Sequence, residues 1–407
     1  MLQYIDVGTQ RVDAYEPVAG YDAVEELHRL GRELRGARLL HVNATPYGGG
    51  VSELLRSVVP IERDLGLQVD WAVITGEPDF YGFTKRLHNG LQGASFEATE
   101  RDRQVYLQTN REAVRDIRGV YDFVIVHDPQ PAAMRAECAD CGRWLWRAHI
   151  DMSHYDAGAW HFLRPYVLEY DRHIFTMPQF VPDGLSSDTV VIIAPGIDPL
   201  SPKNMDLPLD LMRRIVEWNG VSADRPLLTQ VSRFDPWKDP LGVIEVYRAL
   251  KKRRPSLQLA FLGSMALDDP EAWGLYARLV EAAGDDMDIH VLTNFTGVGH
   301  VDVNAFQRCS DVVIQKSIRE GFGLVISETL WKDTPVVAGR TGGIPLQMPD
   351  GVGGCLVDAD DWVGRIDELL GDRARALELA TLGRERVRER FLITRLIAEE
   401  LSVLASL

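Results

Sequence analysis

The sequence is poor in cysteine, in positive charge and in long apolar runs. Its 407 residues include only 4 cysteines, too few for a disulfide-stabilised scaffold. Lysine and arginine number 44 against 60 acidic residues, for a formal net charge of -16, and such a surface repels phosphate backbones and anionic lipid heads. Apolar runs of about 18 residues and a leader-like start are both missing. We therefore expect no nucleic-acid or membrane partner and a cytoplasmic location.

Two of the cysteines, Cys138 and Cys141, have the C-x-x-C spacing of metal and redox sites. No second pair stands nearby, and the surrounding segment is typical of the end of a helix. We therefore expect no metal site at this pair.

Apolar runs of strand length alternate with longer helical patterns in both halves of the chain. Strands are predicted at 37–45, 67–75, 121–128, 144–151 and 171–176, and then at 226–234, 257–263, 288–294, 310–317 and 334–339. Helices are predicted at 51–65, 130–140, 157–168, 239–253 and 269–284. Continuous apolar runs suit strands buried on both faces. The alternation therefore predicts an α/β protein of two doubly wound, Rossmann-like domains that face each other across a cleft.

The stretch 181–204 holds several proline, glycine and serine residues and is the predicted domain junction. An N-terminal domain is expected over 1–195 and a C-terminal domain over 196–385. The last segment, about 386–407, has an amphipathic pattern of one or two helices and is expected to join the first domain. Ligands of such domains bind at the carboxyl ends of the strands, so polar residues there are the first candidates for a site.

Three glycines, Gly48, Gly49 and Gly50, lie between a predicted strand and a predicted helix. Glycines let the backbone turn tightly and let a ligand approach closely. The free N–H groups of the following helix would favour a diphosphate or a sugar oxygen. The motif matches neither common nucleotide-binding loop, and a tight turn that binds nothing is equally consistent with it.

Two cations, Arg233 and Lys238, stand at the end of the strand predicted over 226–234. Arginine offers a planar fork to phosphate oxygens and lysine a compact charge. In so acidic a chain, such a pair at a strand end is where an anionic group would be held. A solvated loop with two unrelated cations is the alternative.

Two carboxylates, Glu320 and Glu328, stand eight residues apart in REGFGLVISE. The residues Phe322, Gly323 and Leu324 would open a helix with free N–H groups. The spacing suits two parts of one elongated ligand better than the paired acids of a hydrolase. Glu328 is also compatible with an ordinary position on a helix surface.

Polar residues follow two neighbouring strands of the first half: His127, Asp128 and Gln130, and then His149 and Asp151. A lone histidine is usually structural, but two such groupings at two strand ends are harder to dismiss. No Gly-x-Ser-x-Gly elbow accompanies them, which argues against a serine hydrolase. Their spacing forms no recognisable metal site.

These motifs together resemble the retaining glycosyltransferases of the GT-B fold, family 4. The resemblance is carried by R-E-G-F-G-L-x-x-x-E, S-R-F-x-P-x-K and the glycine-rich loop, and it covers nearly the whole chain. It is closer still to the trehalose glycosyltransferring synthases, on HVNATPYGGGVSELL, VHDPQPAA, LWRAHIDMS and NAFQRCSDVVIQKSIREGFGL. The resemblance implies glucosyl transfer from ADP-, UDP- or GDP-glucose to free glucose, giving α,α-trehalose, which some members also run in reverse.

The resemblance also implies roles for the candidate residues. Arg233 and Lys238 would hold the donor diphosphate and Glu328 the donor ribose. Glu320 and the amides of Phe322, Gly323 and Leu324 would surround the donor glucose, the Gly48–Gly50 loop would lie near the diphosphate, and His149 near the reaction centre. Asp128, Gln130 and Asp151 would meet the acceptor. Of these, Arg233, Lys238, Glu320 and His149 would be catalytic.

No general base is obvious, and in similar enzymes a leaving phosphate oxygen is thought to take the acceptor proton. No cofactor and no essential metal are expected, because the two cations can neutralise the diphosphate. Similar enzymes are often dimers, so a homodimer is one expected assembly. The alternatives are a trehalose phosphorylase that uses glucose 1-phosphate, a transferase that makes another small glucoside, and a non-catalytic sugar-binding module.

Overall fold

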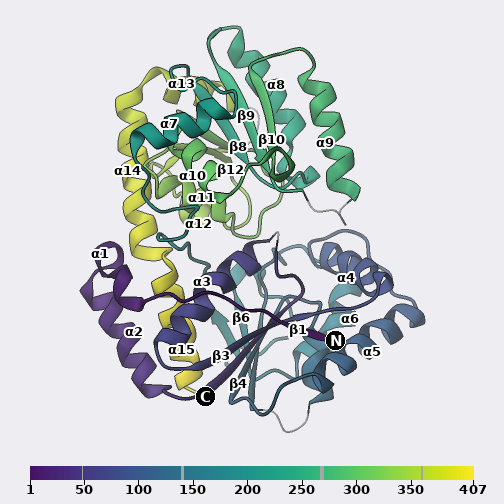
Figure 1. The fold of residues 1–407 in the computed structure, drawn as a ribbon. Coiled ribbons are helices and arrows are strands. Elements are labelled where there is room, and N and C mark those ends of the chain that lie inside the picture. The colour runs from purple at the N-terminus through teal and green to yellow at the C-terminus, as the bar shows by residue number, and fades with distance from the viewer. Residues whose placement is uncertain (48, 139–141, 266–269, 359–360) are drawn as a thin grey trace. The chain divides into compact units, whose positions relative to one another are not determined.

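The computed structural model describes residues 1–47, 49–138, 142–265, 270–358 and 361–407. Two compact units emerge, one of Met1–Gly196 with Ile393–Leu407 and one of Ile197–Leu392 (Figure 1). The sequence predicts the junction between 195 and 196 and the returning segment from about 386. The predicted site residue Gly48 and the cysteine Cys141 lie outside the described residues. Within the described residues, no helix has both the length and the apolar character needed to cross a membrane.

The first unit is built on a sheet of seven strands in its described part. These are β1 (Leu2–Tyr4), β2 (Arg38–Asn43), β3 (Gln68–Ile74), β4 (Phe123–His127), β5 (Arg143–Arg147), β6 (Arg172–Phe175) and β7 (Val190–Ile192). Their order is β1-β3-β2-β4-β5-β6-β7, and all neighbours pair in parallel except β1 and β3. The strand order reverses between β2 and β4, which is where ligands bind in doubly wound folds.

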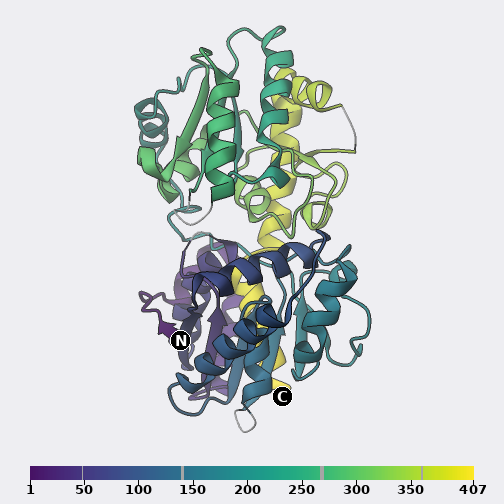
Figure 2. The same ribbon diagram turned by 90° about the vertical axis from the view of Figure 1, so that its right-hand side faces the viewer.

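Helices cover both faces of this first sheet. They are η1 (Val12–Tyr15), α1 (Glu16–Ala19), α2 (Tyr21–Glu33), α3 (Gly50–Asp64), α4 (Pro78–Leu91), α5 (Glu100–Arg115), η2 (Ala132–Glu137), α6 (Ala157–Val167), η3 (Pro178–Phe180) and α15 (Ile393–Ala405). Figures 1 and 2 show α2, α3 and α15 against one face and α4, α5 and α6 against the other. The strands between them are therefore buried on both sides, as their continuous apolar runs require.

The second unit contains a fully parallel sheet of six strands in its described part. These are β8 (Leu227–Val231), β9 (Gln258–Gly263), β10 (Ile289–Thr293), β11 (Val312–Gln315), β12 (Val336–Gly339) and β13 (Gly354–Val357). Their order is β10-β9-β8-β11-β12-β13, the arrangement of dinucleotide-binding domains. The order reverses between β8 and β11, so this pair marks the expected binding edge.

Alternate residues of these strands enter two separate cores. Leu228 and Phe261 pack with α8 (Pro240–Lys251), α9 (Pro270–Ala283) and α13 (Trp362–Gly371), whereas Leu227 and Ala260 pack with α7 (Leu209–Trp218) and α10 (His300–Cys309). The other helices are η4 (Pro236–Lys238), η5 (Asn294–Thr296), α11 (Leu324–Leu330), α12 (Ile344–Gln347) and α14 (Arg373–Arg390). The period of two along each strand produces this division.

Three details differ from the sequence prediction. The helix predicted over 130–140 is instead the short 3-10 helix η2, because Pro129 and Pro131 cannot donate backbone hydrogen bonds at its start. The strands β1, β7 and β13 are not predicted, since runs of three or four residues carry too little periodicity. The C-terminal pattern, left open as one or two helices, forms α14 and α15, separated at Phe391 and Leu392.

Candidate functional site

The predicted site residues fall into two groups, one in each unit. In the first unit, Gly49 and Gly50 follow β2, Asp128 and Gln130 follow β4, and His149 and Asp151 follow β5, three strands that are consecutive in the sheet. In the second unit, Arg233 and Lys238 follow β8, and Glu320, Phe322, Gly323, Leu324 and Glu328 follow β11. Each group therefore lies at the carboxyl edge beside the point where its own strand order reverses.

Lys238 and Glu320 meet although they are 82 residues apart in the sequence. The lysine Nζ lies 2.7 Å from Oε2 of Glu320, and their side chains are only 16% and 11% exposed. Oε2 of Glu320 also accepts hydrogen bonds from Gln315 Nε2 at 3.3 Å and Ser317 Oγ at 3.2 Å. The Glu320 carboxylate, which accepts from three donors, holds the ammonium group of Lys238 in one place.

The loop that carries Lys238 is fixed by two aspartate side chains. Asp235 accepts from the backbone N–H of Trp237 at 2.9 Å, and Asp239 accepts from that of Gly242 at the start of α8. Asp239 adopts a left-handed backbone conformation, with φ of 45°. Its carboxylate also pairs with Lys316. The local turn chemistry of DPWKDP therefore places the lysine at the edge of β8.

Arg233 stands in a different environment from Lys238. Its side chain is 51% exposed, and its guanidinium lies 3.7 Å from Asp235 Oδ2. An exposed pair at that distance is weak. The planar fork of the arginine thus remains able to bind an anion at the edge of the sheet.

Close backbone packing positions the loop between Glu320 and α11. A Cβ atom at Gly342 would overlap the carbonyl oxygen of Glu320, and the N–H of Gly343 donates to the carbonyl of Gly321 at 2.9 Å. Gly323 has a φ of 79°, a conformation that favours glycine. The Phe322 side chain is buried and packs against Phe391, with ring centroids 5.4 Å apart. A ligand here would meet the Phe322 backbone rather than its ring.

Glu328 is buried, which excludes the helix-surface position left open by the sequence. Its Oε1 lies 3.4 Å from Nζ of Lys203. Its Oε2 is buried and has no hydrogen-bond partner among the residues that the structure describes. Lys332 donates to the Glu328 carbonyl and to Asn204 Oδ1, both at 2.8 Å. The carboxylate is held, with one oxygen still able to accept a hydrogen bond.

Asp128 joins β4 to β5 at the edge of the first sheet. Its φ of 64° is unusual for a residue with a side chain. Its Oδ1 accepts the backbone N–H of His149 at 2.8 Å, and its carbonyl accepts Trp146 Nε1 at 3.0 Å. Burial raises the pKa of Asp128 to about 7, although the His149 N–H and Arg147 favour the carboxylate. The aspartate thus sets the backbone position of His149.

A row of three histidines runs from His149 into the sheet. Nδ1 of His127 lies 2.9 Å from Nε2 of His149, and Nδ1 of His41 lies 3.1 Å from Nε2 of His127. At the inner end, Nε2 of His41 lies 3.0 Å from Oε2 of Glu62 on α3. His41 and Glu62 are fully buried. We call these four residues the histidine row; it connects His149 to a carboxylate in the core.

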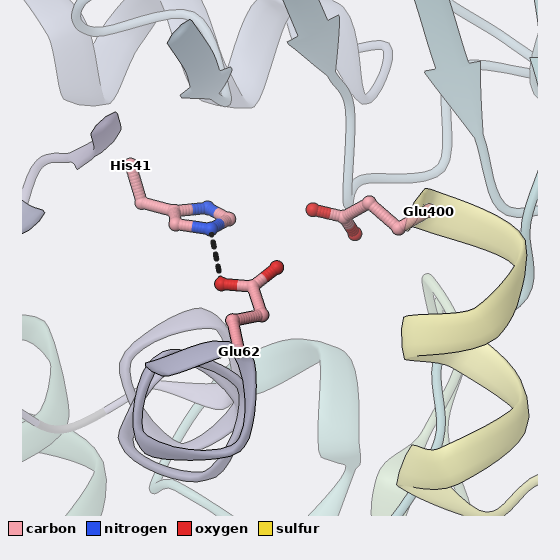
Figure 3. A group of neighbouring side chains, drawn as sticks. All are labelled: His41, Glu62 and Glu400. Carbon is pink, nitrogen blue, oxygen red and sulfur yellow. Dashed lines mark hydrogen bonds and ion pairs between the residues drawn. The ribbon is translucent and has the colours of Figure 1, made fainter. Parts of the chain in front are cut away.

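A second buried acid, Glu400 on α15, lies beside the inner end of the histidine row. Figure 3 shows the carboxylates of Glu62 and Glu400 both directed towards the His41 ring. Ligand atoms of His41, Glu62 and Glu400 lie within 4.8 Å of one another, a spacing that a metal ion could use. Glu400 is instead ion-paired with the buried Arg147 of β5. That guanidinium supplies a positive charge to the group and disfavours a cation there.

Of the remaining candidates in the first unit, Asp151 has local side-chain partners, whereas Gln130 and Gly49 do not show such contacts in the described part of the chain. Asp151 is buried, and its Oδ1 accepts the N–H and the hydroxyl of Ser153. The side-chain oxygen of Gln130 is buried without a hydrogen-bond partner among the described residues. Gly49 has an extended backbone, with φ of -153°, and a Cβ built there would meet nothing within 4 Å. At Gly49, the protein itself does not require glycine.

His41, Glu62, Arg147 and Glu400 were not among the predicted site residues. Each interrupts an apolar pattern: His41 stands inside the buried run of β2, and Glu62 and Glu400 occupy the apolar stripes of α3 and α15. A charged residue at a core position is rarely unpaired. That conflict between residue type and period is the signal that could have identified them.

Comparison with known proteins gives a family match for each of the two units. A family model of the trehalose synthase N-terminal domain matches residues 41–182, and one of glycosyl transferases group 1 matches residues 213–386. A trehalose synthase of Rubrobacter xylanophilus is 47% identical, covering 100% of this chain and 99% of the relative. One of Pyrococcus horikoshii is 43% identical, covering 98% and 97%. A trehalose phosphorylase of Pleurotus pulmonarius is 27% identical, covering 92% of this chain but 58% of the relative.

Solved structures share the fold at low sequence identity. The trehalose-6-phosphate synthase OtsA superposes with a TM-score of 0.71 at 15% identity, covering 91% of this chain and 99% of that one. A sucrose-phosphate synthase of Thermosynechococcus elongatus gives 0.68 at 17% identity, covering 90% and 98%. These likenesses confirm the predicted α/β fold of two Rossmann-like domains, the GT-B fold of glycosyltransferases.

Proposed function

The chain belongs to the trehalose synthase family of GT-B glycosyltransferases, and we propose that it transfers glucose from a nucleoside-diphosphate-glucose to free glucose. The transfer retains the configuration of the anomeric carbon, and the product is α,α-trehalose. Relatives named trehalose synthase match it from end to end at 43–47% identity. The observation that carries the proposal is the Lys238–Glu320 pair at the β8 and β11 edge, with Arg233 on the same loop as Lys238.

The donor diphosphate would bind to Arg233 and Lys238. Breaking the bond between the anomeric carbon and the phosphate oxygen leaves negative charge on the diphosphate. A cation that is already positioned stabilises that charge without reorganisation. Lys238 has three N–H donors and uses one of them on Glu320, so two remain for phosphate oxygens. Arg233 adds an exposed fork in an otherwise acidic protein.

Glu328 would bind the ribose of the donor. A carboxylate accepts hydrogen bonds from two adjacent hydroxyl groups, one on each oxygen. Oε2 of Glu328 has no partner among the described residues, whereas Oε1 faces Lys203. Buried carboxylate oxygens normally have a donor. A ribose hydroxyl is the donor that a nucleotide substrate would supply.

The sugars would bind at Glu320 and at the edge of the first sheet. We assign the donor glucose to Glu320 with the amides of Phe322, Gly323 and Leu324, and to His149. The acceptor would meet Asp128, Gln130 and Asp151, with the glycine loop close by. Gly49 supports a close approach, because no contact with the described residues explains a glycine there.

Retention would follow if the acceptor attacks on the face that the leaving group departs from. A phosphate oxygen of the leaving group then takes the acceptor proton, and no glucosyl–enzyme bond forms. A glucosyl adduct trapped on Glu320 or Asp128 would contradict this step. We also propose that neither a cofactor nor a metal is required, which predicts full turnover in the presence of a strong chelator.

A donor panel tests the function directly. Purified protein is given free glucose with ADP-, UDP- or GDP-glucose or with glucose 1-phosphate, and the disaccharide and its linkage are determined. We expect α,α-trehalose from at least one nucleotide donor. Trehalose formed from glucose 1-phosphate alone would instead show that the protein is a trehalose phosphorylase. That alternative is tested because the relative in Pleurotus pulmonarius is a trehalose phosphorylase. A different glucoside in an acceptor panel would overturn the acceptor assignment.

A further inference from the structure

The histidine row contains buried groups for which the proposed reaction has no use. His127 and His41 are covered, and Glu62 lies in the core between α3 and β2. Residues with such polar side chains are rarely buried unless the arrangement serves a purpose. Their hydrogen bonds lead to His149, one of the residues that we place at the reaction centre.

The nitrogen-to-nitrogen contacts of the histidine row couple the tautomers of the three rings. A neutral imidazole has one N–H donor and one acceptor nitrogen. If His41 donates from Nε2 to Glu62, its Nδ1 accepts from His127 Nε2, and His127 Nδ1 in turn accepts from His149 Nε2. If instead His41 Nδ1 is the donor, every ring is reversed and His149 presents its N–H at Nδ1. The two arrangements differ by one proton in the Glu62–His41 pair.

We propose that Glu62, His41 and His127 are positioning residues that determine, through the proton held between Glu62 and His41, whether Nδ1 of His149 donates or accepts a hydrogen bond. With the proton present, His149 offers an N–H to a sugar oxygen. With the proton absent, the same nitrogen offers a lone pair. This inference deepens the proposed function, because it assigns a state to a residue of that same site.

The transfer along the row balances. A proton that arrives at His149 Nδ1 displaces the Nε2 proton to His127 Nδ1, and His127 Nε2 passes its proton to His41 Nδ1. The extra proton comes to rest between His41 Nε2 and Glu62. One proton enters, none leaves, and the net charge of the row rises from -1 to zero. His149 thereby exchanges a proton without becoming an imidazolium.

The surrounding charges favour storage at the inner end. Burial disfavours a charged His41, but the Glu62 carboxylate outweighs burial and raises the pKa of His41. Burial also raises the pKa of Glu62. At the outer end, burial and then neighbouring positive charge, including Arg147, lower the pKa values of His127 and His149 well below the usual range. A proton is therefore held at the Glu62–His41 pair in preference to the outer rings.

Among the residues that the structure describes, the charged groups that face the row come from four elements or loops. They are Glu62 from α3, Arg147 from β5, Glu400 from α15 and Asp128 after β4. The Arg147–Glu400 pair is internally neutral. Asp128 accepts the backbone N–H of His149 rather than a ring N–H, so Glu62 is the acid that exchanges a proton with the rings.

Nitrogen NMR of the wild-type protein tests the proposal without substrate. Protein labelled with 15N-histidine is titrated with pH, because imidazole nitrogen shifts distinguish the two tautomers. We expect His41, His127 and His149 to change their protonated nitrogen together, with one inflection. Rings that titrate separately, or that hold opposite tautomers, would overturn the proposal. This readout is independent of whether the enzyme uses the donor proposed above.

The variant Glu62→Gln tests the same row through activity. Glutamine keeps the size and hydrogen-bonding capacity of Glu62 but cannot store the proton. Proton uptake would then create a net positive charge beside Arg147 instead of neutralising a negative one. We expect the inflection of kcat/KM against pH to move to lower pH by about one unit or more, together with a lower maximum rate.

His173→Gln provides the matched control. His173 is buried in the same sheet on β6, and it bonds the Val167 carbonyl and Thr189 Oγ1 outside the row. Its loss should affect stability while leaving the inflection where it is in the wild type. An unchanged inflection in Glu62→Gln would refute the proposal. If Glu62→Gln does not fold, the wild-type titration decides alone.

Discussion

The two sheets carry different sets of charged and titratable residues at the same position, the edge where the strand order reverses. In the second unit, the edge between β8 and β11 carries Lys238 and Glu320 in direct contact close to the surface. In the first unit, the edge between β2 and β4 leads through three imidazole rings to an acid buried in the core. A cation positioned at the sheet edge suits a ligand with permanent charge, whereas a buried row suits a group whose proton has to be controlled. The shared topology determines where each set of residues lies, and the chemistry of those residues determines which ligand group each edge can bind.

The largest expected effect is at the charged edge. Lys238→Met removes the positioned cation and leaves Glu320 without its ion pair, so we expect kcat/KM for the nucleotide-sugar to fall about 10³-fold. Steady-state kinetics across the pH range should show a loss that is nearly constant with pH. Lys251→Met is the control, because Lys251 also pairs with a carboxylate, that of Asp288, but at the opposite end of the sheet. Similar losses in both variants would mean that Lys238 acts through stability alone.

The next effect is at the outer end of the histidine row. His149→Ala removes the group that would exchange a proton near the sugars, and we expect kcat to fall about 10²-fold. Unlike the loss in Lys238→Met, this loss should change with pH, because the wild-type residue alters its hydrogen-bonding state. A loss expressed only in KM would place His149 in substrate binding and would remove the contrast between the two edges.

A smaller effect is expected at Glu328. Glu328→Gln weakens hydrogen bonding to a ribose, so KM for the nucleotide donor should rise about 10-fold with little change in kcat. Turnover of glucose 1-phosphate, if any is observed, supplies an internal control because that donor has no ribose. Equal effects on both donors would show that the Lys203–Glu328 pair is structural rather than a contact of the nucleotide.

The smallest effect concerns stability and separates Asp128 from the histidine row. Since the folded-state pKa of Asp128 is raised from 3.8 to about 7, its stabilising contribution is present below pH 3.8 and is lost as the pH rises through 7. Asp128→Asn should remove this loss, and asparagine also tolerates the left-handed conformation. Denaturant unfolding between about pH 5 and about pH 8 should therefore show a flatter profile for the variant. A parallel profile would assign the pH dependence to other groups.

The elements that are long and strongly periodic could be predicted from the sequence. The predicted core strands, and the predicted helices other than the one over 130–140, lie within a few residues of observed elements, as β2 (Arg38–Asn43) and α8 (Pro240–Lys251) do, whereas helices such as α2 and α5 were not predicted. The edge strands β1, β7 and β13 were not predicted, because a run of three or four residues becomes a strand through pairing with neighbouring strands rather than through its own apolar pattern.

The sequence singles out candidate site residues but does not give their contacts. Arg233, Lys238 and Glu320 stand out because they end apolar runs. That Lys238 touches Glu320 depends on the adjacency of β8 and β11, which local sequence does not encode. Glu62 and Glu400 were passed over because each looks like a charged residue on an amphipathic helix. Only the position of the apolar stripe, completed by the fold, shows that they point inward.

The placement of α15 has a consequence for biosynthesis. The helix is synthesised after the whole of the second unit, yet Leu396, Ile397 and Leu401 belong to the interior of the first unit. Its Glu400 is also the counter-ion of Arg147, a strand residue made long before it. While the polypeptide is still growing, the first sheet exposes an apolar face and an uncompensated guanidinium. Completion of the first unit must therefore wait until α15 has been synthesised, whereas the second unit is synthesised in full before that helix.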